Sequence, residues 1–167
     1  INDLRLVGDE SPASRARAIA VLGRIGKPAV ERLMARSPKL RPLACARALA
    51  TIGPPALPAL IEALDDEGDL TRMQRAAEAL GEMGPPARAA VPGLARAADH
   101  PDMWIRIAAL DALGQIGPAA RGAISIVRTR LYDPWVRVPI SAAEALYRIT
   151  GDASEPVAAL RRTLRDV

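Results

Sequence analysis

A short sequence motif recurs along this chain at nearly constant spacing. One copy spans residues 112–118 and reads ALGQIGP, and the copy before it spans residues 79–85 and reads ALGEMGP. The leucines of the successive copies stand at positions 22, 49, 80, 113 and 146. A self-similar period of roughly 20–50 residues is typical of solenoid proteins, in which small units stack side by side. The spacing therefore predicts a solenoid.

Each copy of the motif lies at the end of a stripe of apolar residues that has helical spacing. Before Gly117 the stripe consists of Ile105, Ala108, Ala109, Ala112, Leu113 and Ile116, which share one face of an α-helix. Gly117-Pro118 then ends the helix, because glycine can adopt the left-handed cap conformation and proline cannot continue a helix. A second apolar stripe follows each turn. Each unit is therefore predicted to be a pair of helices, which we name A and B in chain order.

The helix pairs can be followed along the whole chain. The first unit is predicted at residues 2–7 and 12–25, and later units at 28–52, 55–83, 86–116 and 119–149, before a final A helix at 153–165. Pro58 and Pro92 place the regular starts of two A helices near Leu57 and Val91, because proline is tolerated in the first turn. We predict an all-α fold, an α-solenoid of about five helix pairs in one domain, 1–167. A fragment of a longer chain is a further hypothesis, because the end helices lack partners.

Composition restricts the classes of function. The chain has 167 residues and a net charge of +4, and its calculated pI is 10.0. No run of lysine and arginine forms a basic tail. Cys45 is the single cysteine, so a disulfide framework and a cysteine-based metal site are not expected. No apolar run reaches the roughly 18 residues of a membrane span, and no signal peptide follows Ile1. We therefore expect no membrane span and favour a cytoplasmic location.

Two units carry a recognisable family pattern. Ile105-Arg106 precede residues 109–118, which read ALDALGQIGP, and the next unit has Val138 followed by AAEAL at 142–146. This pattern resembles the HEAT-repeat family, in particular the short bacterial type that also occurs in phycobilin lyases. Tyr147 departs from the pattern, since it stands where the family has glycine. The resemblance implies a right-handed superhelix with B helices on the concave side and A helices on the convex side. It implies little about function, because such arrays serve many unrelated tasks.

One column of the B helices carries charged residues. Arg47, Glu78, Asp111 and Glu144 each stand three residues before the glycine slot of their unit. They lie between core positions, so we expect them to project from the concave side in the same register. We interpret the column as a candidate surface for binding a partner. The alternative is ordinary solvated helix surface with weak Glu–Arg pairs, worth about 0–1 kcal/mol each.

Trp104 and Trp135 form a second candidate pair. Each stands near the start of a B helix, shortly after a turn that contains aspartate and proline. Tryptophan is enriched among the residues that dominate binding at protein interfaces. It also covers the core at the edges of repeats, so both interpretations stay open.

No group of residues in the sequence indicates catalysis. His100 is the single histidine, and without a nucleophile or a second ligand it is interpreted as a polar turn residue. The acidic cluster at 65–69 lacks the EF-hand ligand pattern and is interpreted as a helix-capping loop. We expect no catalytic residue, no metal and no cofactor.

The predicted function is a non-catalytic protein–protein interaction scaffold that uses the concave face of the solenoid. The expected partner is another protein or a peptide. A nucleic-acid-binding module is the first alternative, but the acidic column disfavours it because phosphates require basic residues. A phycobilin-lyase-like protein is a further alternative, and it rests on the resemblance alone.

Overall fold

The computed structural model describes residues 21, 24–36 and 42–163, and every regular element in these ranges is a helix. The A helices are α2 (Lys27–Arg36), α4 (Leu57–Ala63), α6 (Val91–Ala97), α8 (Ile124–Arg130) and α10 (Ser154–Thr163). The B helices are α3 (Pro42–Ile52), α5 (Leu70–Met83), α7 (Met103–Ile116) and α9 (Arg137–Thr150). The predicted all-α solenoid is confirmed. The first predicted unit lies almost entirely outside the described residues, as do the ends of the chain and the side chain of Cys45.

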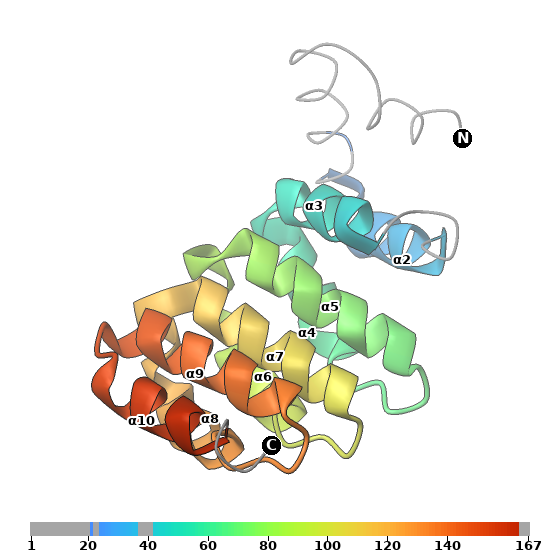
Figure 1. Ribbon diagram of the computed structural model, residues 1–167. Coiled ribbons are helices and arrows are strands. Elements are labelled where there is room, and N and C mark those ends of the chain that lie inside the picture. The colour runs from blue at the N-terminus through green and yellow to red at the C-terminus, as the bar shows by residue number, and fades with distance from the viewer. Residues whose placement is uncertain (1–20, 22–23, 37–41, 164–167) are drawn as a thin grey trace.

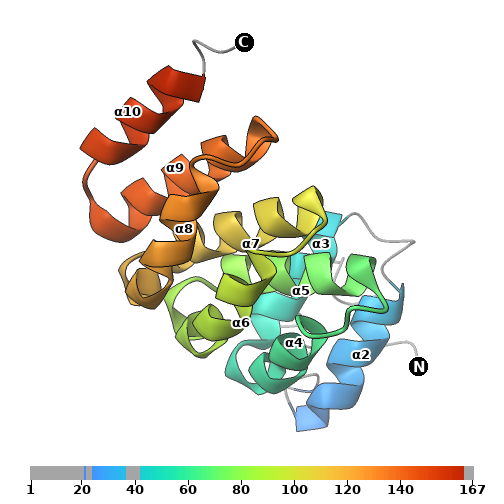
Figure 2. The same ribbon diagram turned by 90° about the horizontal axis from the view of Figure 1, so that it is seen from below.

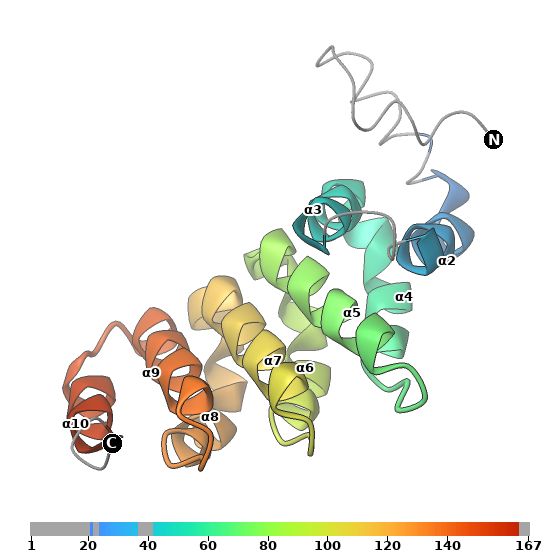
Figure 3. The same cartoon turned by 45° about the vertical axis from the view of Figure 1, so that its right-hand side comes forward.

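The helices form two layers. Helices α3, α5, α7 and α9 lie side by side in one layer, as Figure 1 shows, and each packs directly against the next. Helices α4, α6 and α8 form the second layer behind them, which is seen most clearly in Figure 3, and α2 packs against α4 at the end of this layer. The apolar stripes of both layers meet between them. The leucines of the repeated motif form the centre of this core, because each is at most 1% exposed: Leu49, Leu80, Leu113 and Leu146.

Short 3₁₀ segments lead into the A helices and widen their layer. They span Pro54–Ala56, Pro85–Ala90 and Gly117–Ala123, and α6 packs against the last of these segments. Helices α4 and α6 begin at Leu57 and Val91, as Pro58 and Pro92 predicted. Because the B helices are in direct contact while the A layer holds these added segments, the B layer forms the concave side (Figure 2).

The glycines that end the B helices adopt backbone conformations that side chains disfavour. Gly53, Gly84 and Gly117 have φ of 74°, 63° and 68° with ψ between −148° and −140°. This combination mirrors the extended region and is open almost only to glycine. The predicted left-handed cap is therefore wrong for these three ends. It is found at Gly151, where φ is 78° and ψ is 0°. At Gly53, Gly84 and Gly117 the chain turns sharply into a 3₁₀ segment. A left-handed cap would send the chain in a different direction.

The first glycine of the motif, which is Gly81 in α5 and Gly114 in α7, sets the distance between B helices. A Cβ atom at Gly114 would lie 3.0 Å from the Cα atom of Ala145 on α9. The equivalent atom at Gly81 would lie 3.0 Å from the Cα atom of Ala112 on α7. Contacts this short would require the neighbouring helix to shift if a side chain were present, so glycine allows the helix backbones to approach. Tyr147 occupies the same slot in α9 and is 52% exposed, since no further B helix follows α9 within the described residues.

Replacement of Gly114 by glutamine should therefore destabilise the protein by about 1–3 kcal/mol, the usual range for overpacking a filled site. The same replacement at Gly122 is the matched control, because a Cβ atom there meets nothing within 4 Å. Thermal and urea unfolding of both variants measure the difference. Equal stability of the two variants would contradict the close approach of α7 and α9.

A buried arginine joins the loops of two neighbouring units. Arg106 on α7 is 6% exposed, and its Nη1 donates to the carbonyl oxygens of His100 and Pro101 at 2.8 and 2.7 Å. Its Nη2 donates to Oδ1 of Asp133 at 3.1 Å, and its Nε lies 3.0 Å from Oδ2 without the alignment of a hydrogen bond. Arg130 approaches the same carboxylate at 3.6 Å. The guanidinium group therefore fixes the loop before α7 to the loop before α9.

Asp133→Ala should cost about 3–5 kcal/mol, because it leaves the buried Arg106 without its counter-ion. Asp99→Ala is the control, since Asp99 pairs with Arg130 at an exposed site, where such pairs contribute about 0–1 kcal/mol. Chemical unfolding monitored by circular dichroism compares the two. Similar losses from both variants would refute a special role for the buried pair.

Candidate functional site

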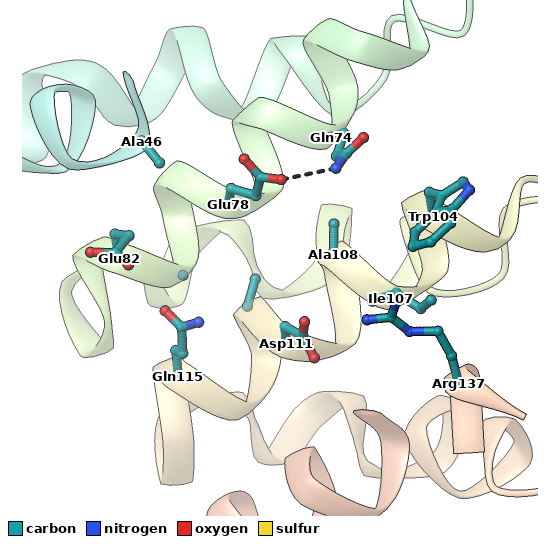
Figure 4. Close-up of a pocket in the computed structure, with 12 residues that line it drawn as sticks. Ala46, Gln74, Glu78, Glu82, Trp104, Ile107, Ala108, Asp111, Gln115 and Arg137 are labelled. Carbon is teal, nitrogen blue, oxygen red and sulfur yellow. Dashed lines mark hydrogen bonds between the residues drawn. The ribbon is translucent and has the colours of Figure 1, made fainter. Parts of the chain in front are cut away.

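The concave layer contains a groove that crosses the B helices. Its main hollow has a volume of about 350 Å³ and is lined by side chains of α5, α7 and α9 together with Ala46 of α3 (Figure 4). Trp104, Ile107 and Ala108 supply apolar surface on the α7 side. The polar lining residues are Gln74, Glu78, Glu82, Asp111, Gln115 and Arg137. Rigid helices rather than loops therefore hold almost every side chain of the hollow.

A second hollow of about 170 Å³ continues the groove between α7 and α9. Asp111 and Gln115 line both hollows, and Ser141, Glu144 and Arg148 complete the second one. Arg148 pairs with Glu144 at 2.5 Å, so Glu144 is compensated, whereas Asp111 leaves this hollow with one carboxylate more than arginines. The two hollows together extend the groove over successive repeats.

The structure brings most of the predicted site residues together. Glu78, Asp111 and Trp104 line the main hollow, and Glu144 lines the second one. Arg47 lines neither hollow, but its Nε lies 3.5 Å from Oε2 of Glu82 at the α3 end of the groove. Trp135 also lies outside both hollows and is 58% exposed. The two tryptophans therefore do not share one surface pocket, although their sequence contexts are alike.

Arg137 is a groove residue that the sequence interpretation missed. It extends from the start of α9 toward α7, and its guanidinium carbon lies 5.2 Å from the centre of the Trp104 ring (Figure 4). A cation at this distance from an aromatic face is attracted by the ring quadrupole. The signal was available, because residue 137 occupies the same register in its unit as Trp104 does in the preceding one.

The carboxylates of the main hollow differ in their partners. Glu82 pairs with Arg47, whereas Glu78 accepts a hydrogen bond from the Gln74 amide at 2.9 Å. Among the described residues no ion pair forms with Glu78 or Asp111. The hollow therefore combines three carboxylates with one arginine and is locally acidic, in contrast to the net charge of +4 of the chain.

Asp111 is the carboxylate most affected by its surroundings. Partial burial in the groove raises its pKa above the ordinary value, although the residue as a whole remains exposed to solvent. The Ser141 hydroxyl lowers the pKa, Glu144 raises it, and Arg148 and Arg137 lower it by smaller amounts. The ionised carboxylate is therefore insufficiently compensated within the groove.

The other sequence candidates have local structural roles. Asp69 and Asp102 cap α5 and α7, because their side chains accept hydrogen bonds from backbone amides of the first turn. His100 Nδ1 accepts a hydrogen bond from the Asp102 amide at 3.0 Å. Over the described ranges, no three histidine, cysteine or acidic side chains gather closely enough to hold a metal ion. In the same ranges, each helix is too short or too polar to traverse a lipid bilayer.

Comparisons with known families agree with the repeat pattern. The model for HEAT repeats matches residues 72–147, and the model for the PBS lyase HEAT-like repeat matches residues 43–66. The resemblance noted in the sequence is thereby confirmed. No curated protein sequence matches this chain.

Solved structures with a similar fold include natural and designed solenoids. The complex of CpcE and CpcF of phycocyanin lyase from Nostoc sp. contains a chain with 27% identity and a TM-score of 0.58. That likeness covers 92% of this chain but only 65% of the other, so this chain spans just under two thirds of its length. A designed armadillo repeat protein in complex with the peptide (KR)4 has 14% identity and a TM-score of 0.59, with 96% and 86% covered. An engineered protein has 19% identity and a TM-score of 0.57, with 96% and 85% covered.

The raised pKa of Asp111 predicts the sign of a stability change. A carboxyl group with a raised pKa in the folded state favours folding at low pH and opposes it once ionised. Asp111→Asn should therefore be more stable than the parent at neutral pH, and this gap should close as the pH falls below the ordinary aspartate value of 3.8. Melting temperatures measured between pH 7 and pH 3 test this.

Asp152→Asn is a control with the opposite sign. The Ser154 backbone and hydroxyl donate to Asp152 and lower its pKa, so ionised Asp152 stabilises the start of α10. That variant should lose stability at neutral pH, and its deficit should vanish as the pH falls. If Asp111→Asn also loses stability at neutral pH, the carboxylate is compensated in the groove and the interpretation is incorrect.

Proposed function

Because this chain carries HEAT repeats at residues 43–66 and 72–147, we propose that it is a non-catalytic scaffold that binds another protein. An extended segment of the partner lies in the concave groove and crosses helices α5, α7 and α9. The residues that bind the segment within the groove are Glu78, Asp111, Glu144 and Trp104. Arg47 contributes at one end of the groove, and Trp135 contributes outside it.

The groove itself is the observation that carries this proposal. Its two hollows adjoin along the B layer and share Asp111 and Gln115, so a single bound segment can contact several repeats. The lining combines partly exposed apolar surface with carboxylates and amides, which is the composition expected for recognition of a peptide rather than of a lipid or a nucleic acid. Stacked repeats also hold such a surface rigid, so little conformational entropy is lost on binding.

The similar solved structures support a role in assembly. CpcE and CpcF form a complex of two proteins, and one of its chains is 27% identical to this one. The designed armadillo protein shares only the fold, so the peptide that it binds does not identify a partner for this chain. The chemistry of a partner therefore follows from the side chains of this groove.

A lyase-related role is the second candidate, and the phycocyanin lyase likeness favours it. In that case the chain handles a chromophore or its acceptor protein. Co-expression with a phycobiliprotein subunit and a bilin source tests it, since covalent attachment of the chromophore is visible by zinc fluorescence of denatured gels. Absence of attachment, with both proteins expressed, rejects this candidate.

The scaffold proposal is tested by reversing the acidic side chains of the groove. A triple variant that carries lysine at positions 78, 111 and 144 should no longer retain the proteins that the unaltered chain retains from a lysate of its source organism, because both charge and shape of the lining change. Quantitative mass spectrometry of the two pull-downs measures the loss.

A second triple variant controls for the change of net charge. It carries lysine in place of Glu62, Glu67 and Glu155, none of which lines the groove. This variant should retain the same proteins as the unaltered chain. The proposal fails when the groove variant retains them equally well. Proteins that appear only with either lysine variant are attributed to the added positive charge.

A further inference from the structure

We infer that the groove recognises a basic segment, in which a lysine or arginine side chain inserts between Trp104 and the carboxylates of Glu78 and Asp111. This inference rests on the proposed function, because it identifies the class of partner for the same groove. It adds the sign of the partner's charge, the position of the decisive side chain and a role for Arg137.

Two carboxylates of the hollow form no ion pair within the described part of the chain. Glu78 on α5 accepts a hydrogen bond from the amide of Gln74, and Asp111 on α7 lines the same hollow (Figure 4). Ser141, Arg148 and Arg137 compensate Asp111 only in part, because its pKa remains raised. The third carboxylate, Glu82, is already paired with Arg47. An added positive charge would therefore meet two partners in a partly desolvated site, where electrostatic interactions are stronger than in bulk water.

Trp104 supplies the aromatic wall of the same site. The residue is 46% exposed, and it borders the hollow. Arg137 already places a guanidinium group over this ring at 5.2 Å. The protein therefore shows in its own structure that the ring accepts a cation. Arg137 is an internal competitor, because it holds positive charge at the place where the partner's side chain would enter.

The arrangement of the repeats favours an extended segment over a helix. Adjacent packed helices are about 8–10 Å apart, so equivalent side chains of successive B helices repeat at roughly that distance. A polyproline II segment places every third side chain on one face and advances about 3.1 Å per residue, which is roughly 9 Å per three residues. A basic residue at every third position would therefore meet the carboxylates of successive repeats.

The test uses three synthetic peptides of the same length against the full chain. The first carries arginine at every third position among proline and serine, and the other two carry glutamine or glutamate in place of arginine. Fluorescence anisotropy at low salt should show binding of the arginine peptide, no binding of the glutamate peptide and at least roughly tenfold weaker binding of the glutamine peptide.

Variants of the chain then locate the bound cation. Glu78→Gln and Asp111→Asn should each weaken binding of the arginine peptide roughly tenfold, and Trp104→Leu should weaken it severalfold. Because Asp111→Asn is expected to stabilise the fold at neutral pH, its loss of affinity cannot be attributed to unfolding. Glu67→Gln is the matched control, since Glu67 lies outside the groove, and it should leave the affinity unchanged.

Arg137→Gln gives the most selective outcome. Removing the internal cation should tighten binding of the arginine peptide severalfold, whereas the glutamate peptide should still not bind. Weaker binding of the arginine peptide to this variant, or preference of the unaltered chain for the glutamate or glutamine peptide, overturns the inference. A groove that binds the glutamate peptide would still be an interaction surface, so the scaffold proposal would survive. That proposal fails separately, when reversal of the groove charges leaves the retained proteins unchanged.

Discussion

The direct contact between successive B helices determines the form of this solenoid. At Gly81 and Gly114 the absence of a side chain lets each helix approach the alanine backbone of the next one, and a larger residue would push the two helices apart. The A helices are held further apart by the 3₁₀ segments that precede them, so the array curves toward the B layer. The curvature brings equivalent positions of successive B helices onto one inner surface. The groove, the column of charged residues that lines it and the position of Trp104 all follow from this contact between B helices.

Charge is distributed unevenly over the molecule. The chain as a whole is basic, yet its concave groove holds three carboxylates and a single arginine in the main hollow. Many arginines have structural partners instead, such as Arg106 with Asp133 in the buried network and Arg96 with Asp65 on the surface. A calculated pI is therefore a poor guide to what this surface binds. The local sign of the groove disfavours nucleic acid and favours a basic segment.

The repeat period was sufficient to predict the helices, the core leucines and the register of Glu78, Asp111 and Glu144. It also predicted the starts of α4 and α6, since proline tolerates few helical positions. It could not predict the ψ angles of the helix-ending glycines, because a positive φ is compatible with two very different turns. It missed the burial of Arg106 and the stacking of Arg137 on Trp104. The burial of Arg106 depends on a contact with a residue 27 positions away, which a single helical stripe does not encode. The stacking of Arg137 on Trp104 joins residues 33 positions apart, so only a comparison of the two repeats could have suggested it.

The central claim is that a basic segment binds across the concave face, and its location can be measured directly. Backbone amide and tryptophan indole signals of the isotopically labelled chain can be followed by nuclear magnetic resonance while an arginine-containing peptide is added. We expect the largest shifts at residues 74–82, at the Trp104 indole and at residues 107–115, with little change in α4, α6 and α8. Shifts concentrated in those convex helices, or spread evenly over the surface, would contradict the claim.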